Sequence, residues 1–307
     1  MKDLRNAGFA ALLMFAVACE KENDVETLQP VDDSPVFMTL PARDRSAGRE
    51  ATNPQYAVFS AQYLTSAESG QVGRTVYFYN VGNKQLEEDF VPGLSLDATD
   101  DISYYIDETR PSDDLPFAVT TAAINRAMQT WEGVECSTLG LFRVPSDPAI
   151  STGFVSALLG FGGSFDYVAD VVHAGWLPAD FFDLIAPDGS EYILGVTFTI
   201  IFTDDQGNPV DTDNNSKVDV AWREIYYNDT FEWADGDHYD VETIALHEAG
   251  HGLSQGHFGK AFRTNGNNKL HFAPRAVMNA AYSGIQTEIN GSDNGGHCSN
   301  WASWPAN

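Results

Sequence analysis

Residues 240–257 read DVETIALHEAGHGLSQGH. The first half predicts an α-helix, because apolar residues recur at helical spacing and Asp240 is a favourable N-cap residue. On such a helix His247 and His251 are four residues apart, so their imidazoles project from one face, one turn apart. The pair therefore predicts a site where two ring nitrogens bind one metal ion.

Two further residues of this stretch fit a catalytic metal site. Glu248 is offset around the helix, so it is better placed to take a proton from a water on the metal than to bind the metal. His257 would lie about 15 Å beyond His247 on a straight helix, so it can be a third ligand only if the chain folds back. Three protein ligands leave the fourth tetrahedral position free, which is typical of catalytic rather than structural zinc.

The chain reversal before His257 depends on backbone conformation. Ser254 stands where a metal-binding turn is expected to carry glycine. Either Ser254 adopts a strained backbone with positive φ, at about 1–3 kcal/mol, or Gly252 and Gly256 make the reversal, since glycine tolerates such a conformation. We expect the glycines to make it.

The stretch resembles the metzincin signature H-E-x-x-H-x-x-G-x-x-H. The segment AVMNAAYSG at 276–284 is similar to the Met-turn of that family. Its tyrosine follows the methionine by four residues, as in matrixins, the group that contains the matrix metalloproteases. The resemblance runs from about residue 101 to 284. It implies that Met278 lies beneath the metal, and that Tyr282 lines the pocket that receives the substrate side chain after the cleaved bond. No segment resembles the cysteine switch of that family.

Spacing and resemblance together predict that His247, His251 and His257 bind Zn²⁺. Zinc brings the pKa of its water to about 7 and polarises the carbonyl under attack. Glu248 then acts as general base and passes the proton to the departing amine, with no covalent intermediate. We therefore expect a zinc-dependent endopeptidase acting on a protein or peptide substrate.

Two other functions stay open. One is a surface binding or adhesion protein that keeps a zincin fold without proteolysis, against which the intact Glu248 argues. The other is a zinc hydrolase of a non-protein substrate. The net charge of -27 repels polyanions, so nucleic acid is not an expected partner.

The remaining patterns predict an α+β fold with a mixed, twisted sheet. Residues 117–134 have helical spacing, and the run at 191–204 predicts a buried central strand. Further strands are expected at 56–64, 74–81, 101–107, 139–144 and 218–227. The resulting division is a signal peptide (1–18), a flexible acidic linker (19–50), a small β-rich region (51–98) and a matrixin-like catalytic domain with active-site helix and Met-turn (99–307).

The N-terminus predicts export. Twelve apolar or small residues, 7–18, follow two basic residues; they are too few to span a bilayer but fit the core of a signal peptide. The sequence AVACEKEND resembles a bacterial lipoprotein signal, which implies that Cys19 carries a lipid. The protein is then anchored at the outer membrane or cell surface and contacts membrane only through that anchor. Ordinary secretion, with cleavage near Ala18, is the alternative.

The two cysteines other than Cys19 are Cys136 and Cys298. In an exported protein they can form one disulfide, or they can be two buried thiols.

An acidic segment, DTDNNSKVD at 211–219, resembles the start of a calcium loop. Ser216 at position six and Trp222 at position twelve exclude a complete EF-hand. Either a looser calcium site or a solvated acidic turn is expected. The calcium ligands would be Asp211, Asp213, Asn215 and Asp219.

Overall fold

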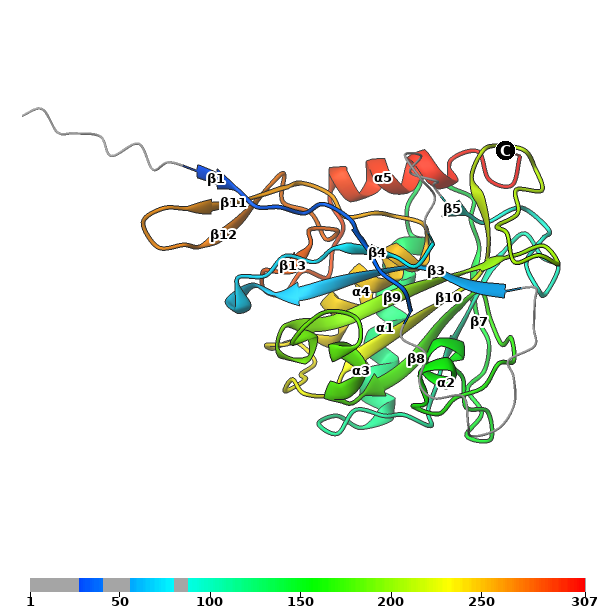
Figure 1. Cartoon of the computed structure of the whole chain (residues 1–307), viewed down its shortest axis with the longest axis horizontal. Helices are drawn as coiled ribbons and strands as arrows, with labels where there is room; N and C mark the ends of the chain where they lie inside the picture. Colours follow the sequence, from blue (N-terminus) through cyan, green and yellow to red (C-terminus); the bar gives the residue numbers. More distant parts are fainter. Residues whose placement is uncertain (1–27, 41–55, 80–87, 307) are drawn as a thin grey trace, which may run out of the picture.

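A mixed β-sheet runs through the computed structural model, which describes residues 28–40, 56–79 and 88–306 (Figure 1). In spatial order its main strands are β2 (Val36–Phe37), β4 (Thr75–Tyr77), β3 (Tyr56–Ser66), β9 (Ile193–Phe202), β10 (Val218–Asn228), β8 (Val171–Leu177), β6 (Ile102–Ile106) and β7 (Leu141–Arg143). Two short strands join it, β13 (Ala281–Tyr282) beside β3 and β5 (Glu88–Asp89) beside β10.

The sheet confirms the predicted α+β class and the central strand. β9 pairs antiparallel with both β3 and β10, while β10, β8, β6 and β7 pair parallel to one another. Nine of the ten residues of β9 are buried, because both faces of the sheet are covered. A nearly continuous run of β-branched and aromatic residues suits such a strand.

Helices cover both faces of this sheet (Figure 1). On one face α1 (Phe117–Glu132) packs against α4 (Val241–Gly252), and Trp131 joins them by donating to the carbonyl of Leu246 at 2.8 Å. On the other face lie α2 (Phe154–Leu159) and α3 (Ala179–Asp183), in a segment for which the sequence predicts no element. The helix expected at 117–134 is confirmed.

The N-terminal strands are part of the main sheet. β3 pairs with β9 on one side and with β4 and β13 on the other. Residues 56–79 therefore share the sheet of the expected catalytic domain instead of forming a region of their own. Within the expected flexible linker, β2 pairs with β4, and β1 (Leu28–Pro30) pairs with β11 (Lys260–Thr264). β11 and β12 (Leu270–Ala273) form a hairpin. Residues 28–40 are therefore held by strand pairing, which supplies partners for otherwise open edges.

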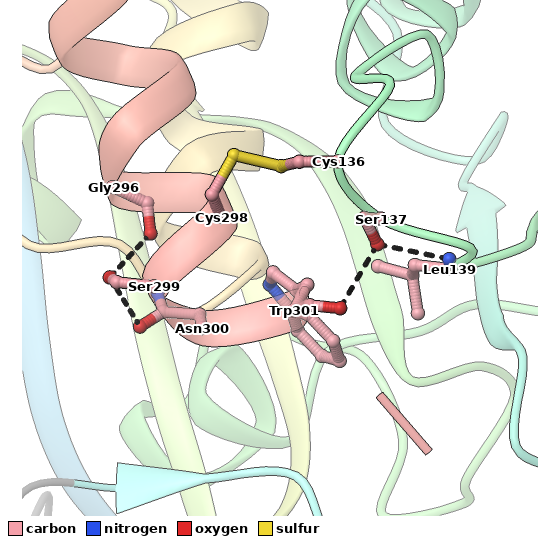
Figure 2. Close-up of a disulfide and its surroundings, with 8 residues drawn as sticks. All are labelled: Cys136, Ser137, Leu139, Gly296, Cys298, Ser299, Asn300 and Trp301. Carbon is pink, nitrogen blue, oxygen red and sulfur yellow. Dashed lines mark hydrogen bonds between the residues drawn. A yellow bond between two sulfur atoms is a disulfide. The ribbon is translucent and has the colours of Figure 1, made fainter. Parts of the chain in front are cut away.

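The C-terminal helix α5 (Gly291–Trp301) is tied to the loop after α1 (Figure 2). A disulfide joins Cys136 to Cys298, with Cα atoms 5.8 Å apart. Beside it, Ser137 donates a hydrogen bond to the carbonyl of Trp301 at 3.3 Å. Of the two pairing states that the sequence leaves open, the structure contains the disulfide.

The predicted signal peptide and Cys19 lie outside the described residues. No helix in the described ranges is long and apolar enough to cross a membrane.

Candidate metal centre and active site

Helix α4 presents the first two histidines. Asp240 caps it as predicted, its side chain accepting from the backbone N–H of Thr243 at 2.8 Å. Eleven of the twelve helical residues are buried, so the helix lies inside the molecule. The Nε2 atoms of His247 and His251 are 3.1 Å apart, a contact that one turn of separation allows.

His257 completes the cluster from outside the helix. Its Nε2 lies 3.2 Å from Nε2 of His251, and the three rings offer nitrogens within 4.8 Å of one another. The structure therefore brings together all three residues that the sequence predicts as ligands.

The hydrogen bonds of the rings decide what the cluster can bind. Nδ1 of His247 lies 2.8 Å from the carbonyl oxygen of Val277, and Nδ1 of His251 lies 2.6 Å from that of Gln255. Because a carbonyl only accepts, each Nδ1 carries the proton, and each Nε2 of a neutral ring keeps its lone pair. Lone pairs facing one another repel unless a cation lies between them. Tetrahedral zinc with Zn–N of about 2.0–2.1 Å needs nitrogens about 3.3 Å apart, so the donors fit zinc.

Burial keeps these histidines neutral. It lowers the pKa of His247 to about 4 and lowers the pKa of His251 well below its usual value. For His251 the neighbouring rings of His257 and His247 add to the effect, because a like charge disfavours protonation. Neutral imidazoles are the form that binds a metal.

The turn that brings His257 back contradicts our prediction about the glycines. Ser254 has φ 64°, whereas neither Gly252 nor Gly256 has a positive φ. Ser254 N–H donates to the carbonyl of His251 at 3.0 Å, and Gln255 N–H donates to that of Gly250 at 2.9 Å. This pair of bonds is the Schellman motif, which places its left-handed residue at a fixed distance from the helix end.

The position of Ser254 explains why the prediction was wrong. Gly252 lies inside the last helical turn, where an added Cβ would be 3.0 Å from Val171. The residue that must adopt the left-handed conformation is two positions after Gly252, which is Ser254. The helix end fixes this position, regardless of which residue occupies it. The side chain of Asn300 donates to the carbonyl of Ser254 at 2.7 Å and helps to hold the conformation.

Met278 lies directly against α4. A Cβ added at Gly250 would be 2.3 Å from the Met278 sulfur, so the helix and the turn approach too closely for any residue but glycine. Val277 in the same turn supplies the carbonyl that orients His247. The turn thus packs against α4 and fixes the ring of His247.

Asp293 holds this turn, a role that sequence reasoning missed. Its two carboxylate oxygens accept from the backbone N–H groups of Val277 at 3.0 Å and Met278 at 3.1 Å. Asp293 also forms a capping box with Asn290 at the start of α5. The N-x-x-D pattern at 290–293 could have predicted the helix start, but not the contact with the turn.

Glu248 is buried beneath the sheet. Its Oε2 accepts from the hydroxyl of Thr197 at 2.6 Å, and the backbone N–H of Leu64 also acts on the carboxylate. Burial raises the pKa of Glu248 to about 8, while the Thr197 and Leu64 hydrogen bonds act in the opposite direction. Gly195 makes room for the carboxylate, since a Cβ there would be 2.9 Å from Oε1.

Tyr282 lines a small cavity of about 20 Å³ together with Leu64, Thr243 and His247. Its hydroxyl accepts from the backbone N–H of Asp240 at 3.3 Å, at the start of α4. The tyrosine therefore forms a wall beside His247, and its oxygen is directed to the helix N-terminus.

The acidic segment brings only part of its predicted ligands together. Carboxylate oxygens of Asp211, Asp213 and Asp219 lie within 4.8 Å of one another. Asp219 is 1% exposed, and its Oδ1 has no hydrogen-bond partner among the described residues. Asn215 instead donates to Asp213 at 3.0 Å, while its side-chain oxygen accepts from the backbone N–H of Lys217.

Comparison with known proteins does not identify a family. No protein-family model matches the chain, and no curated protein matches its sequence significantly.

Proposed function

We propose that this chain is a zinc-dependent endopeptidase. The observation that carries the proposal is the convergence of three Nε2 atoms, 3.1 and 3.2 Å apart, at a helix that also carries the buried carboxylate of Glu248. Bound zinc supplies a Lewis acid that polarises a peptide carbonyl and acidifies water. The resemblance to matrixins supports the same reaction.

The residues of this chain have separate tasks in that reaction. Glu248 accepts the proton of the attacking water and delivers it to the departing amine. Thr197 donates to Oε2, which orients the carboxylate of Glu248. The carbonyls of Val277 and Gln255 fix the ring tautomers that keep Nε2 available.

The decisive experiment compares Glu248→Gln with Glu242→Gln. Both changes remove one carboxylate from α4, but Glu242 contacts Arg126 and lies outside the histidine cluster. Zinc per chain and cleavage of a mixed peptide library are measured with and without a chelator. Glu248→Gln should retain zinc and lose activity by at least about 100-fold, whereas Glu242→Gln should cleave at the wild-type rate.

Two results would refute the proposal. One is equal chelator-sensitive cleavage by wild type and Glu248→Gln. The other is stoichiometric zinc with no cleavage by wild type or by Leu64→Ala, a change that loosens strand β3; that result would favour a binding protein. Cleavage of esters or glycans alone would redirect the proposal to a non-protein substrate.

We also propose that the three aspartates hold a structural calcium ion. The support is the buried, unpartnered Oδ1 of Asp219, because burying an unpaired carboxylate is costly without a cation.

For localisation, we propose export with a lipid on Cys19. The Cys136–Cys298 disulfide supports an oxidising compartment. Labelling cells with a fatty acid analogue tests the anchor, since Cys19→Ala should abolish incorporation.

A further inference from the structure

The proposed base cannot contact a substrate in the observed conformation. Glu248 is 0% exposed, and His247 and His251 are 1% and 0% exposed. Catalysis requires Glu248 to contact water at the reacting bond. Some element that covers it must therefore move.

Strand β3 is that element. The carboxylate touches β9 at two residues, Thr197 through a hydrogen bond and Gly195 through close packing. In the strand register Thr197 is paired with Gln62 and Gly195 with Leu64, both on β3. The carboxylate thus lies along the seam where β3 joins β9.

β3 also contacts the segment that follows the Met-turn. Thr65 and Ser66 pair with Ala281 and Tyr282 of β13, parallel to it, and the Thr65 hydroxyl donates to the carbonyl of Ala280 at 3.2 Å. Leu64, 2% exposed, lines the small cavity that His247 and Tyr282 share. An extended chain therefore fills the space between β9 and β13, with an apolar side chain at the cavity beside the metal-binding histidines.

We propose that β3 occupies the place of an extended peptide substrate, so that this conformation is latent until β3 is displaced. The inference rests on the proposed endopeptidase function. Removal of β3 would open the backbone edges of β9 and β13, which can pair with an incoming peptide as they now pair with β3. It would also open the route to Glu248.

Nine of the eleven residues of β3 are buried and five of those nine are apolar, so release of the strand has a cost that the remaining four lower. Those four are polar, which reduces the apolar area that holds the strand in place. These residues are Ser60, Gln62, Thr65 and Ser66. Their hydrogen-bonding groups can be satisfied by water when the strand is released.

The test locks or loosens β3 in the full-length, zinc-loaded protein. Ser60 and Thr199 are paired, buried and small, so the double variant Ser60→Cys, Thr199→Cys can cross-link β3 to β9. Leu64→Ala loosens the strand. Leu141→Ala is the matched control, because it makes the same change in β7, at the opposite edge of the sheet.

Peptide cleavage is measured for each protein, oxidised and reduced, with wild type treated identically to account for the Cys136–Cys298 disulfide. We expect the oxidised cross-link to abolish cleavage and reduction to raise the cleavage rate again by at least about tenfold. Leu64→Ala should cleave at least about tenfold faster than wild type, because it shifts the population toward the open state. Leu141→Ala should not gain activity. Mass spectrometry verifies the cross-link.

Each outcome separates this inference from the proposed function. If the oxidised cross-link cleaves as fast as the reduced form, or if Leu141→Ala gains as much as Leu64→Ala, latency through β3 is wrong and the protease function stands. If every variant binds zinc and none cleaves peptide, both proposals fail.

Discussion

Replacing Ser254 by glycine should stabilise the protein while leaving His247, His251 and His257 in place. Ser254 holds φ 64° at the end of α4, a conformation that costs a residue with a side chain about 1–2 kcal/mol. Glycine avoids that cost but loses about 0.5–1 kcal/mol through its larger freedom in the unfolded chain. The Ser254 hydroxyl is buried without a hydrogen-bond partner, so its removal recovers about 1 kcal/mol more.

The net expectation is a gain of about 1–2.5 kcal/mol in the free energy of unfolding, or about 2–4 °C in melting temperature for a chain of this size. Guanidinium unfolding and calorimetry at fixed zinc concentration measure both quantities. The hydrogen bonds of the turn use backbone atoms, so zinc stoichiometry should not change.

Gly256→Ala is the control for this prediction. Gly256 lies two residues away, has no positive φ, and an added Cβ would approach only the end of Gln62, at 3.9 Å. The change should leave the protein as stable as wild type or more stable by up to about 1 kcal/mol, because alanine reduces the freedom of the unfolded chain. A Ser254→Gly variant that is no more stable than wild type would contradict the assignment of Ser254 as the strained position. So would a Gly256→Ala variant destabilised by more than about 1 kcal/mol, because that loss would indicate that Gly256 holds a backbone conformation that alanine cannot adopt.

Three further predictions concern other parts of the molecule. Replacing Cys136 and Cys298 by serine should lower the free energy of unfolding by up to about 5 kcal/mol, from the closure entropy of their 162-residue separation; an unchanged guanidinium midpoint would contradict this. Burial lowers the pKa of His173 from 6.5 to about 3, so the folded state resists protonation and stability should fall as pH drops below 6.5, by up to about 1.4 kcal/mol per unit. The His173→Gln variant should show a shallower decline in pH-dependent unfolding, and parallel curves would disprove the assignment. Calcium at 100 times its dissociation constant should stabilise wild type by about 2.7 kcal/mol and should not stabilise Asp219→Asn; equal melting shifts in both would argue against the site.

Features set by neighbouring residues could be predicted from the sequence. The helical spacing at 117–134 and the cap at Asp240 depend on contacts within a few residues, and both are confirmed. The histidine spacing likewise predicts a cluster, because His247 and His251 lie on one helix and His257 follows only six residues after His251.

Features set by distant residues could not be predicted in the same way. Thr197 and Asp293 contact the centre from a strand and a helix far along the chain, and neither lies in a motif that indicates such a contact. The alternating pattern of β3 predicts a strand, but contains no information about its neighbour β9. At Ser254 the local rule that favours glycine was overridden by the position of the helix end.

The pairing of β3 with β13 also affects how the chain can fold. Thr65 bonds to Ala280, 215 residues further along. Loops this long close slowly, and sheets built from distant segments form late. The side of β3 that pairs with β13 must therefore stay open until nearly all of the chain has been synthesised, although β3 can pair with β4 and β9 earlier. We expect slow refolding, and a tendency to aggregate when folding is interrupted, to accompany this arrangement.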